Sequence, residues 1–130
     1  MSEQEKLKVG SVSWADLTVE NADEVRDFYS QVVGWQPVGL EMGGYSDYCM
    51  NEPGTDKSVV GICHARGPNR DLPAQWLIYI TVEDLDKSIA RCVELGGEVI
   101  NGPRDMGKQG RYCVIRDPAG AVAGLFETAK

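Results

Sequence analysis

Histidine is the scarcest acid–base side chain of this 130-residue chain, which contains one, His64. A centre with several histidine ligands inside one chain is therefore excluded, and histidine-based acid–base catalysis would have to use His64. Basic residues are also outnumbered, with 13 Lys and Arg against 20 Asp and Glu and a net charge of −7. Because no basic cluster occurs, we expect a small-molecule or protein partner and no nucleic acid.

Long apolar runs and paired-cysteine motifs are missing as well. The longest apolar run, at 76–80, is too short to cross a bilayer, and the polar first residues lack the apolar core of a signal peptide. The four cysteines form no CxxC pair and lie within apolar patterns, which favours reduced thiols over a disulfide. These features predict a cytoplasmic protein with no membrane partner.

What the sequence does contain is an internal repeat. Thr18-Val19-Glu20 recurs 63 residues later as Thr81-Val82-Glu83, and Gly61 aligns with Gly124 at the same shift. Between these matches, Tyr48-Cys49 aligns with Tyr112-Cys113 at a shift of 64, as if one residue were inserted. A polar, turn-rich stretch at 65–75 predicts a linker. We therefore expect one domain over 1–130, with repeats at about 10–64 and 76–128.

Both halves predict the same order of elements. A strand at 12–19 precedes apolar residues at helical spacing, with Asn21 and Glu24 close to a capping box and Gly34 as the stop. In the second half Asp84 is the expected cap. Three β-prone stretches follow each helix, at 36–40, 46–51 and 58–64, and at 98–101, 111–116 and 121–127. The glycine-rich segment 101–110 is expected to be a mobile flap.

This duplicated βαβββ unit resembles the vicinal oxygen chelate (VOC) superfamily, which contains glyoxalase I, bleomycin resistance proteins and dioxygenases. The motifs that carry the resemblance are Phe28-Tyr29 with Gly34-Trp35, Leu95-Gly96-Gly97 and Asp117-Pro118-Ala119-Gly120. It implies an α+β fold of two tandem βαβββ modules, the glyoxalase-like fold, with each sheet curving around half of a cavity. It also implies a homodimer.

The resemblance further implies where a metal would bind. Metal-dependent members carry a His or Gln on the first strand and a Glu on the last strand of each module. The matching positions in this sequence hold Trp14, Gly61, Leu77 and Gly124. Indole nitrogen only donates hydrogen bonds, and leucine and glycine carry no ligand atom. We therefore expect no metal and no cofactor.

The residues at these positions suggest a small-molecule site instead. Strand alternation puts Asp16 on the face of Trp14 and Tyr79 on the face of Leu77, and adds Cys63 and Phe126 beside the glycines. The predicted ligand-binding residues are Trp14, Asp16, Gly61, Cys63, Leu77, Tyr79, Gly124 and Phe126. Together they would form an apolar, aromatic cup with one carboxylate and one phenol. A closed core filled by the large side chains is the alternative.

Asp16 is the best candidate for chemistry, because burial in an apolar cup would raise its pKa toward that of a general base. A carboxylate that merely bonds to neighbouring backbone is the alternative for this residue. His64 lies one residue beyond an inward position, so we expect it to face solvent or a helix. A Cys63–His64 nucleophile pair is disfavoured because adjacent strand residues point to opposite faces.

Several functions follow from these features. The leading hypothesis is a VOC protein without metal ligands that binds a small, partly apolar molecule in a cup formed by both repeats, with catalysis undecided. One alternative is a metal-dependent lyase, isomerase or dioxygenase of the same superfamily. Another is a protein that sequesters a cationic drug, which would suit the acidic charge. A pure interaction module with a filled core is the last.

Overall fold

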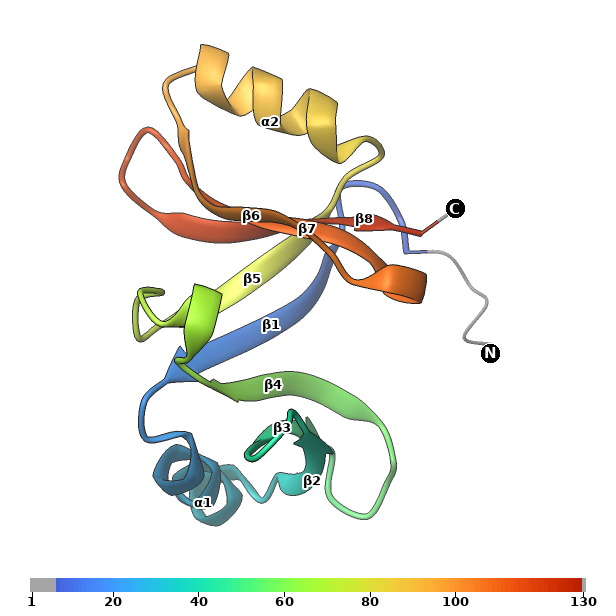
Figure 1. Ribbon diagram of the computed structural model, residues 1–130. Helices are drawn as coiled ribbons and strands as arrows, with labels where there is room; N and C mark the ends of the chain where they lie inside the picture. Colours follow the sequence, from blue (N-terminus) through green and yellow to red (C-terminus); the bar gives the residue numbers. More distant parts are fainter. Residues whose placement is uncertain (1–6, 130) are drawn as a thin grey trace. The chain divides into compact units, whose positions relative to one another are not determined.

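The computed structural model describes residues 7–129, which form two compact units. The first module comprises residues 14–76, and the second comprises residues 77–129 together with 7–13. Each module contains one α-helix that lies along a β-sheet (Figure 1). The division between the units falls inside the first strand, whose first two residues belong to the second module.

The first module follows the predicted order of elements. Its elements are β1 (Val12–Val19), α1 (Ala22–Val33), β2 (Gln36–Glu41), β3 (Ser46–Asn51) and β4 (Ser58–His64). The strands are ordered β2-β3-β4-β1, with β1 parallel to β4 and the other neighbours antiparallel. A short 3-10 turn, η1 (Gly67–Asn69), follows in the predicted linker.

The second module repeats this arrangement. Its elements are β5 (Trp76–Thr81), α2 (Leu85–Glu94), β6 (Glu98–Asp105), η2 (Gly107–Gln109), β7 (Gly110–Arg116) and β8 (Val122–Thr128). The strands are ordered β5-β8-β7-β6, and the β5–β8 pair is again the parallel one. The predicted α+β fold with two tandem βαβββ modules is therefore confirmed.

The helix ends match the sequence signals at two points and differ at one. Gly34 ends α1 in the left-handed conformation, with φ 82°. Asp84 caps α2, because its carboxylate accepts the backbone N–H of Lys87 at 3.1 Å. The side chain of Asn21, by contrast, accepts no backbone N–H and instead donates to Glu24 Oε1 at 3.0 Å. The predicted capping box is therefore wrong at α1.

Each helix covers one face of its own sheet. In the first module Ala22 of α1 is fully buried against Met50 and Ile62 of the sheet, and Tyr29, Trp35 and Trp76 pack against this cluster. In the second module Leu85 of α2 forms the corresponding cluster with Cys113 and Leu125 of the sheet. Burying a side chain of this size contributes about 1.5–3 kcal/mol. We call the other face of each sheet the helix-free face of that module.

The strand register confirms one of the two repeat shifts and overturns the other. Asp16 pairs with Gly61 and Tyr79 pairs with Gly124, so the shift of 63 holds for the first and last strands. The match at 64 does not hold, because Tyr48 packs on the α1 cluster whereas Tyr112 stacks on Tyr79 at the helix-free face. A slip of one residue exchanges the two faces of a strand.

The glycine-rich segment at 101–110 differs from the expected flap. Strand β6 continues through this segment to Asp105 and pairs with β7, and β7 begins at Gly110. A β-bulge between Asn101 and Arg104 accommodates the glycine and proline that suggested a loop. The segment is therefore an ordered strand followed by the η2 turn.

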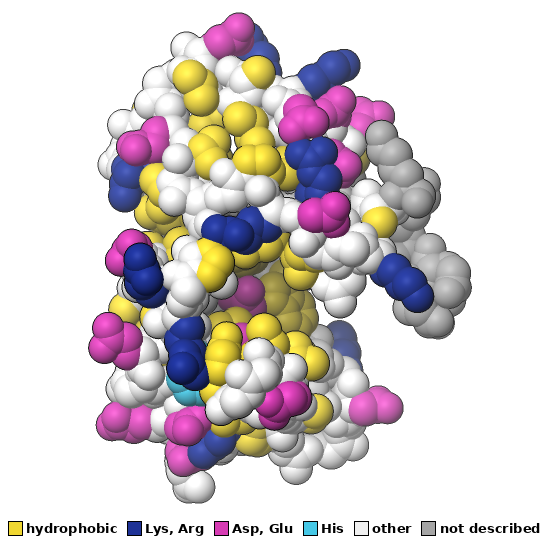
Figure 2. All heavy atoms as spheres, viewed as in Figure 1, with side chains coloured by type: hydrophobic (Ala, Val, Ile, Leu, Met, Phe, Trp, Pro, Cys, Tyr) yellow, Lys and Arg dark blue, Asp and Glu magenta, His cyan; other side chains and the backbone are white. Residues whose placement is uncertain are grey.

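Two further observations concern the surface and the thiols. Within residues 7–129, no helix is long and apolar enough to span a membrane. All four cysteines are free thiols. On the face shown in Figure 2, Lys and Arg side chains are interspersed with Asp and Glu and form no broad basic patch.

Candidate functional site

The first module brings four of the predicted site residues together on its helix-free face. Trp14 and Asp16 are successive same-face residues of β1, and the Trp14 indole Nε1–H donates to Asp16 Oδ1 at 2.6 Å. Gly61 lies opposite Asp16 on β4. A Cβ atom at Gly61 would stand 2.3 Å from Asp16 Oδ1, so the carboxylate occupies the space that a side chain at this position would need.

Burial of the Asp16 carboxylate has the largest effect on its pKa. Burial raises the pKa of Asp16 from its ordinary 3.8 to about 6, with the nearby charge of Asp47 adding to this effect and the Trp14 hydrogen bond opposing it. Among residues 7–129, no Lys or Arg forms an ion pair with Asp16. A carboxyl with a pKa near 6 can exchange a proton close to neutral pH.

Cys63 shares this face but is poorly suited to be a nucleophile. It lies two residues after Gly61 on β4, beside Asp47 of β3. Burial raises the pKa of the Cys63 thiol, and the negative charges of Asp16 and Asp47 raise it further. Because the thiolate is the reactive form, this thiol stays protonated and unreactive at neutral pH.

His64 lies on the α1 side of β4, away from Asp16. Its Nε2 is 3.5 Å from Asp23 Oδ1 of α1, and its Nδ1 is 3.4 Å from Asp47 Oδ1. Its backbone N–H donates to the same Asp47 oxygen at 2.8 Å. Glu127, which occupies the equivalent position in the second repeat, also contacts its own helix, where its carboxylate accepts the backbone N–H of Leu85 at 2.7 Å.

The second module places its four predicted site residues on the corresponding face. Tyr79 lies over Gly124, where an added Cβ atom would stand 2.2 Å from the phenol ring. Tyr79 also stacks edge-on against Tyr112, with ring centroids 6.1 Å apart. Leu77 is fully buried two residues before Tyr79, and Phe126 pairs with Tyr112. The prediction that both groups of four line one cup stays a prediction.

The residues at the family's metal positions do not fit a metal ion. The Trp14 nitrogen is committed as a donor to Asp16, and the space above Gly61 is filled by that carboxylate. In the second module Leu77 has no donor atom and the Tyr79 ring fills the space above Gly124. Within the described part of the chain, no group of three or more His, Cys, Asp or Glu side chains has metal-binding geometry.

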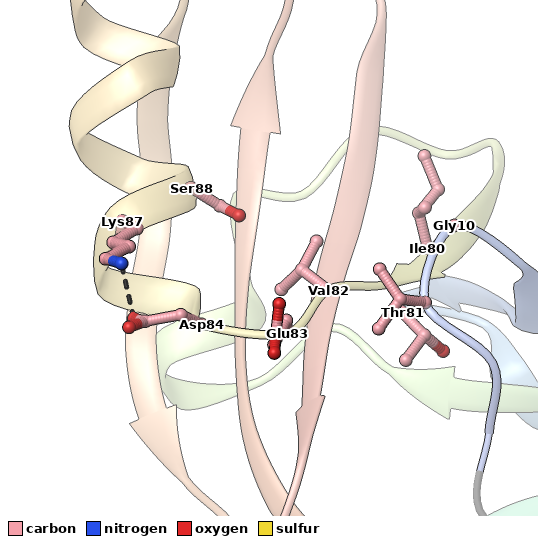
Figure 3. Close-up of a pocket in the computed structure, with 9 residues that line it drawn as sticks. Gly10, Ile80, Thr81, Val82, Glu83, Asp84, Lys87 and Ser88 are labelled. Atoms are coloured by element: carbon pink, nitrogen blue, oxygen red, sulfur yellow. Dashed lines mark hydrogen bonds between the residues drawn. The ribbon is translucent and has the colours of Figure 1, made fainter.

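One open pocket lies elsewhere, beside the start of α2 in the second module (Figure 3). Its volume is about 360 Å³, and Asp84, Lys87 and Ser88 border it on the helix side. The remaining lining residues are Val9, Gly10, Ile80, Thr81, Val82 and Glu83. None of the eight predicted ligand-binding residues lines this pocket, so it is separate from the candidate site.

Two groups near the candidate site were missed by sequence reasoning. Asp47 and Cys49 lie on the helix-free face of the first module, because Cys49 pairs with Gly61. On the second module, Asn101 and Arg104 reach the corresponding face through the bulge in β6. Strand alternation from Gly61 could have found Asp47 if the pairing of β3 with β4 were known. No sequence signal could have placed Arg104, because a bulge changes the alternation.

The duplicated βαβββ arrangement, with a helix-free face on each module, defines the class of glyoxalase-like VOC domains. The sequence profile of the Glyoxalase/Bleomycin resistance protein/Dioxygenase superfamily matches residues 11–123. The chain therefore belongs to this superfamily.

Two curated relatives match most of this chain. The chain is 30% identical over 122 residues to a Mycobacterium tuberculosis protein named as a glyoxylase, CFP32, covering 94% of this chain and 46% of that protein. It is 32% identical over 121 residues to the anthracycline biosynthesis protein DnrV of Streptomyces peucetius, covering 91% and 42%. The chain thus spans about half the length of these relatives.

Similarity to solved structures concerns the fold alone. The methylmalonyl-CoA epimerase of Mycobacterium tuberculosis matches with a TM-score of 0.59 at 18% identity, covering 99% of this chain and 97% of that one. The hypothetical protein BH1468 of Bacillus halodurans matches with a TM-score of 0.64 at 16% identity, covering 95% and 97%.

Proposed function

We propose that this VOC protein binds a small, partly apolar molecule without the help of a metal ion. The binding residues would be Trp14, Asp16, Gly61 and Cys63 on the first module and Leu77, Tyr79, Gly124 and Phe126 on the second. Aromatic rings would contact the apolar part of the molecule, and the Asp16 carboxylate would accept a hydrogen bond from its polar part. With a pKa of about 6, Asp16 could also take up a proton from the ligand.

The observation that carries the proposal is the Asp16–Trp14 pair above Gly61. The indole N–H and the carboxylate bond at 2.6 Å in the space that a family metal ligand at position 61 would occupy. A buried carboxylate is costly unless it is hydrogen-bonded, and one neutral donor satisfies only part of its bonding capacity. A ligand hydroxyl or amine would supply a second donor. This supports a polar anchor within an apolar face.

The test uses 2-naphthol, a flat apolar probe with one hydroxyl donor, and follows tryptophan fluorescence during titration. We expect saturable binding by EDTA-treated protein, with no gain in affinity on adding Zn²⁺, Ni²⁺, Mn²⁺ or Fe²⁺. Gly61→Ala should weaken binding about tenfold, because its Cβ displaces the Asp16 carboxylate from Trp14. Gly39→Ala is the control, since its nearest neighbour would be 3.9 Å away.

The same titration decides between the alternatives. Binding that appears only after metal loading, with one metal ion per chain, would favour the metal-dependent lyase, isomerase or dioxygenase. Doxorubicin, a flat polycyclic compound whose sugar carries a basic amine, tests drug sequestration, which the similarity to DnrV and the carboxylates Asp16 and Asp47 make worth examining. Micromolar binding of doxorubicin without binding of 2-naphthol would favour sequestration. Absence of saturable binding by both probes would overturn the proposal.

A further inference from the structure

An asparagine and an arginine of β6 share the helix-free face of the second module. Asn101 pairs with Val114 and Arg104 pairs with Tyr112, and both partners belong to the face that carries Gly124 and Phe126. Residues three apart on a regular strand point to opposite faces. The bulge between Asn101 and Arg104 removes this alternation, and the Arg104 Nε–H donates to Asn101 Oδ1 at 3.1 Å.

The bulge is built into the sheet by one glycine. Gly102 has φ 88°, and a Cβ atom there would lie 2.9 Å from the Tyr112 carbonyl oxygen and 3.1 Å from the Cys113 Cα. Only glycine accommodates both this backbone conformation and this close approach. Bulges of this kind redirect side chains and occur often beside functional sites. Here the redirected side chain is the guanidinium of Arg104.

Within the described part of the chain, Arg104 has no counter-ion, whereas the other arginines of this module each have one. Arg91, Arg111 and Arg116 each pair with a carboxylate. Within residues 7–129, no Asp or Glu forms an ion pair with Arg104, although its side chain is partly buried. Asn101, which is 8% exposed, fixes one edge of the guanidinium and leaves its other N–H donors to a ligand.

We propose that Arg104, held by Asn101, binds the carboxylate of an aromatic or otherwise partly apolar acid. A guanidinium matches a carboxylate with two parallel hydrogen bonds, and such bonds are strongest where water is partly excluded. Tyr79, Tyr112 and Phe126 offer aromatic surface on the same face for the rest of the acid. The inference rests on the proposed small-molecule function and adds the charge class of the ligand.

The experiment compares benzoate with benzamide, which have nearly the same shape but differ in charge. Both are titrated at pH 7 into ¹⁵N-labelled protein, following the arginine Nε–Hε signals and the backbone amides. We expect benzoate to bind at least about tenfold more tightly than benzamide and to shift the Arg104 Nε–Hε signal. Arg104→Gln should lose this preference, and Arg104→Lys, which keeps the charge without the two-pronged geometry, should lose part of it.

Arg70→Gln is the matched control, because it removes the same charge from an exposed linker residue and should leave both affinities unchanged. A dispersed amide spectrum of Arg104→Gln verifies that this variant is folded. Equal affinities for benzoate and benzamide, or benzoate binding by Arg104→Gln equal to that of the wild type, would overturn the inference. If 2-naphthol still binds in that case, the proposed function stands. If neither 2-naphthol nor benzoate binds, both fail.

Discussion

At the scale of single residues, the two modules share one packing arrangement but differ in the side chain that forms it. The residue opposite the last-strand glycine lays its side chain over that glycine, and this residue is Asp16 in the first module and Tyr79 in the second. Both occupy space that a larger residue at the glycine would need. The space beside the family's last-strand metal position is thus filled by a carboxylate in the first module and by a phenol in the second, and both groups can form hydrogen bonds to a ligand.

The raised pKa of Asp16 predicts how stability depends on pH. Its pKa is about 6 in the folded protein and near 3.8 without burial, so the folded state binds the proton more tightly. Between about pH 4 and pH 6 the unfolded state releases this proton first, and the Asp16 contribution therefore falls as pH rises. The loss is on the order of 2 kcal/mol between pH 4 and pH 7, and it is nearly complete at about pH 7.

Asp16→Asn should remove this dependence while its amide oxygen still accepts the Trp14 hydrogen bond. We expect the free energy of unfolding of the variant, relative to the wild type, to rise by about 2 kcal/mol between pH 4 and pH 7. Urea unfolding at several pH values measures the difference. Asp56→Asn, at an exposed position, is the control for loss of a carboxyl group. A difference between Asp16→Asn and the wild type that stays constant with pH would contradict the raised pKa of Asp16.

At the scale of elements, the repeat supplies its own control for helix capping. Asp84 and Asn21 occupy equivalent positions before α2 and α1, but Asp84 alone accepts a backbone N–H of its helix. Asp84→Ala should lower the free energy of unfolding by about 1 kcal/mol, and Asn21→Ala by no more than a few tenths. Thermal or urea unfolding of both variants checks this. Equal losses would mean that the cap bond contributes nothing measurable.

The sequence predicted the elements better than their pairing. Strands at 46–51 and 58–64 were predicted with their observed bounds, because β-formers lie between clear turn residues there. Register depends on contacts between distant strands, so the match of Tyr48 with Tyr112 placed two residues on one face that in fact lie on opposite faces. The bulge in β6 was missed for a similar reason, since Gly102 indicates a break in a strand and a loop equally well.

The difference between local spacing and strand pairing also explains which residues of the candidate site could be predicted. Trp14 and Asp16 share a face because they are two residues apart on one strand, and alternation alone predicts this. The proximity of Asp47 to Cys63 depends on how β3 pairs with β4, and the position of Arg104 depends on an irregularity in β6. Local spacing thus predicted the residues contributed by one strand. It could not predict the ones that neighbouring strands add.

At the scale of the whole molecule, the family resemblance predicts a homodimer, and the structure offers one exposed strand where a second chain could pack. Strand β2 is the edge strand in the first module, paired with β3, and all six of its residues are exposed. Val38 and Leu40, on one face of β2, are 49% and 54% exposed. An exposed edge strand with apolar side chains is a favourable place for a second chain to pack, because its backbone groups and apolar surface are both uncovered.

We therefore expect light scattering to give twice the mass of one chain at micromolar concentration. Leu40→Lys should shift the protein toward monomer, because it puts a charge among the apolar side chains of β2. Leu95→Lys is the matched control, since Leu95 is 63% exposed at the end of α2 and its replacement should leave the dimer intact. A monomeric wild type would refute the dimer itself. A dimer that withstands Leu40→Lys but dissociates with Leu95→Lys would move the interface from β2 to the end of α2.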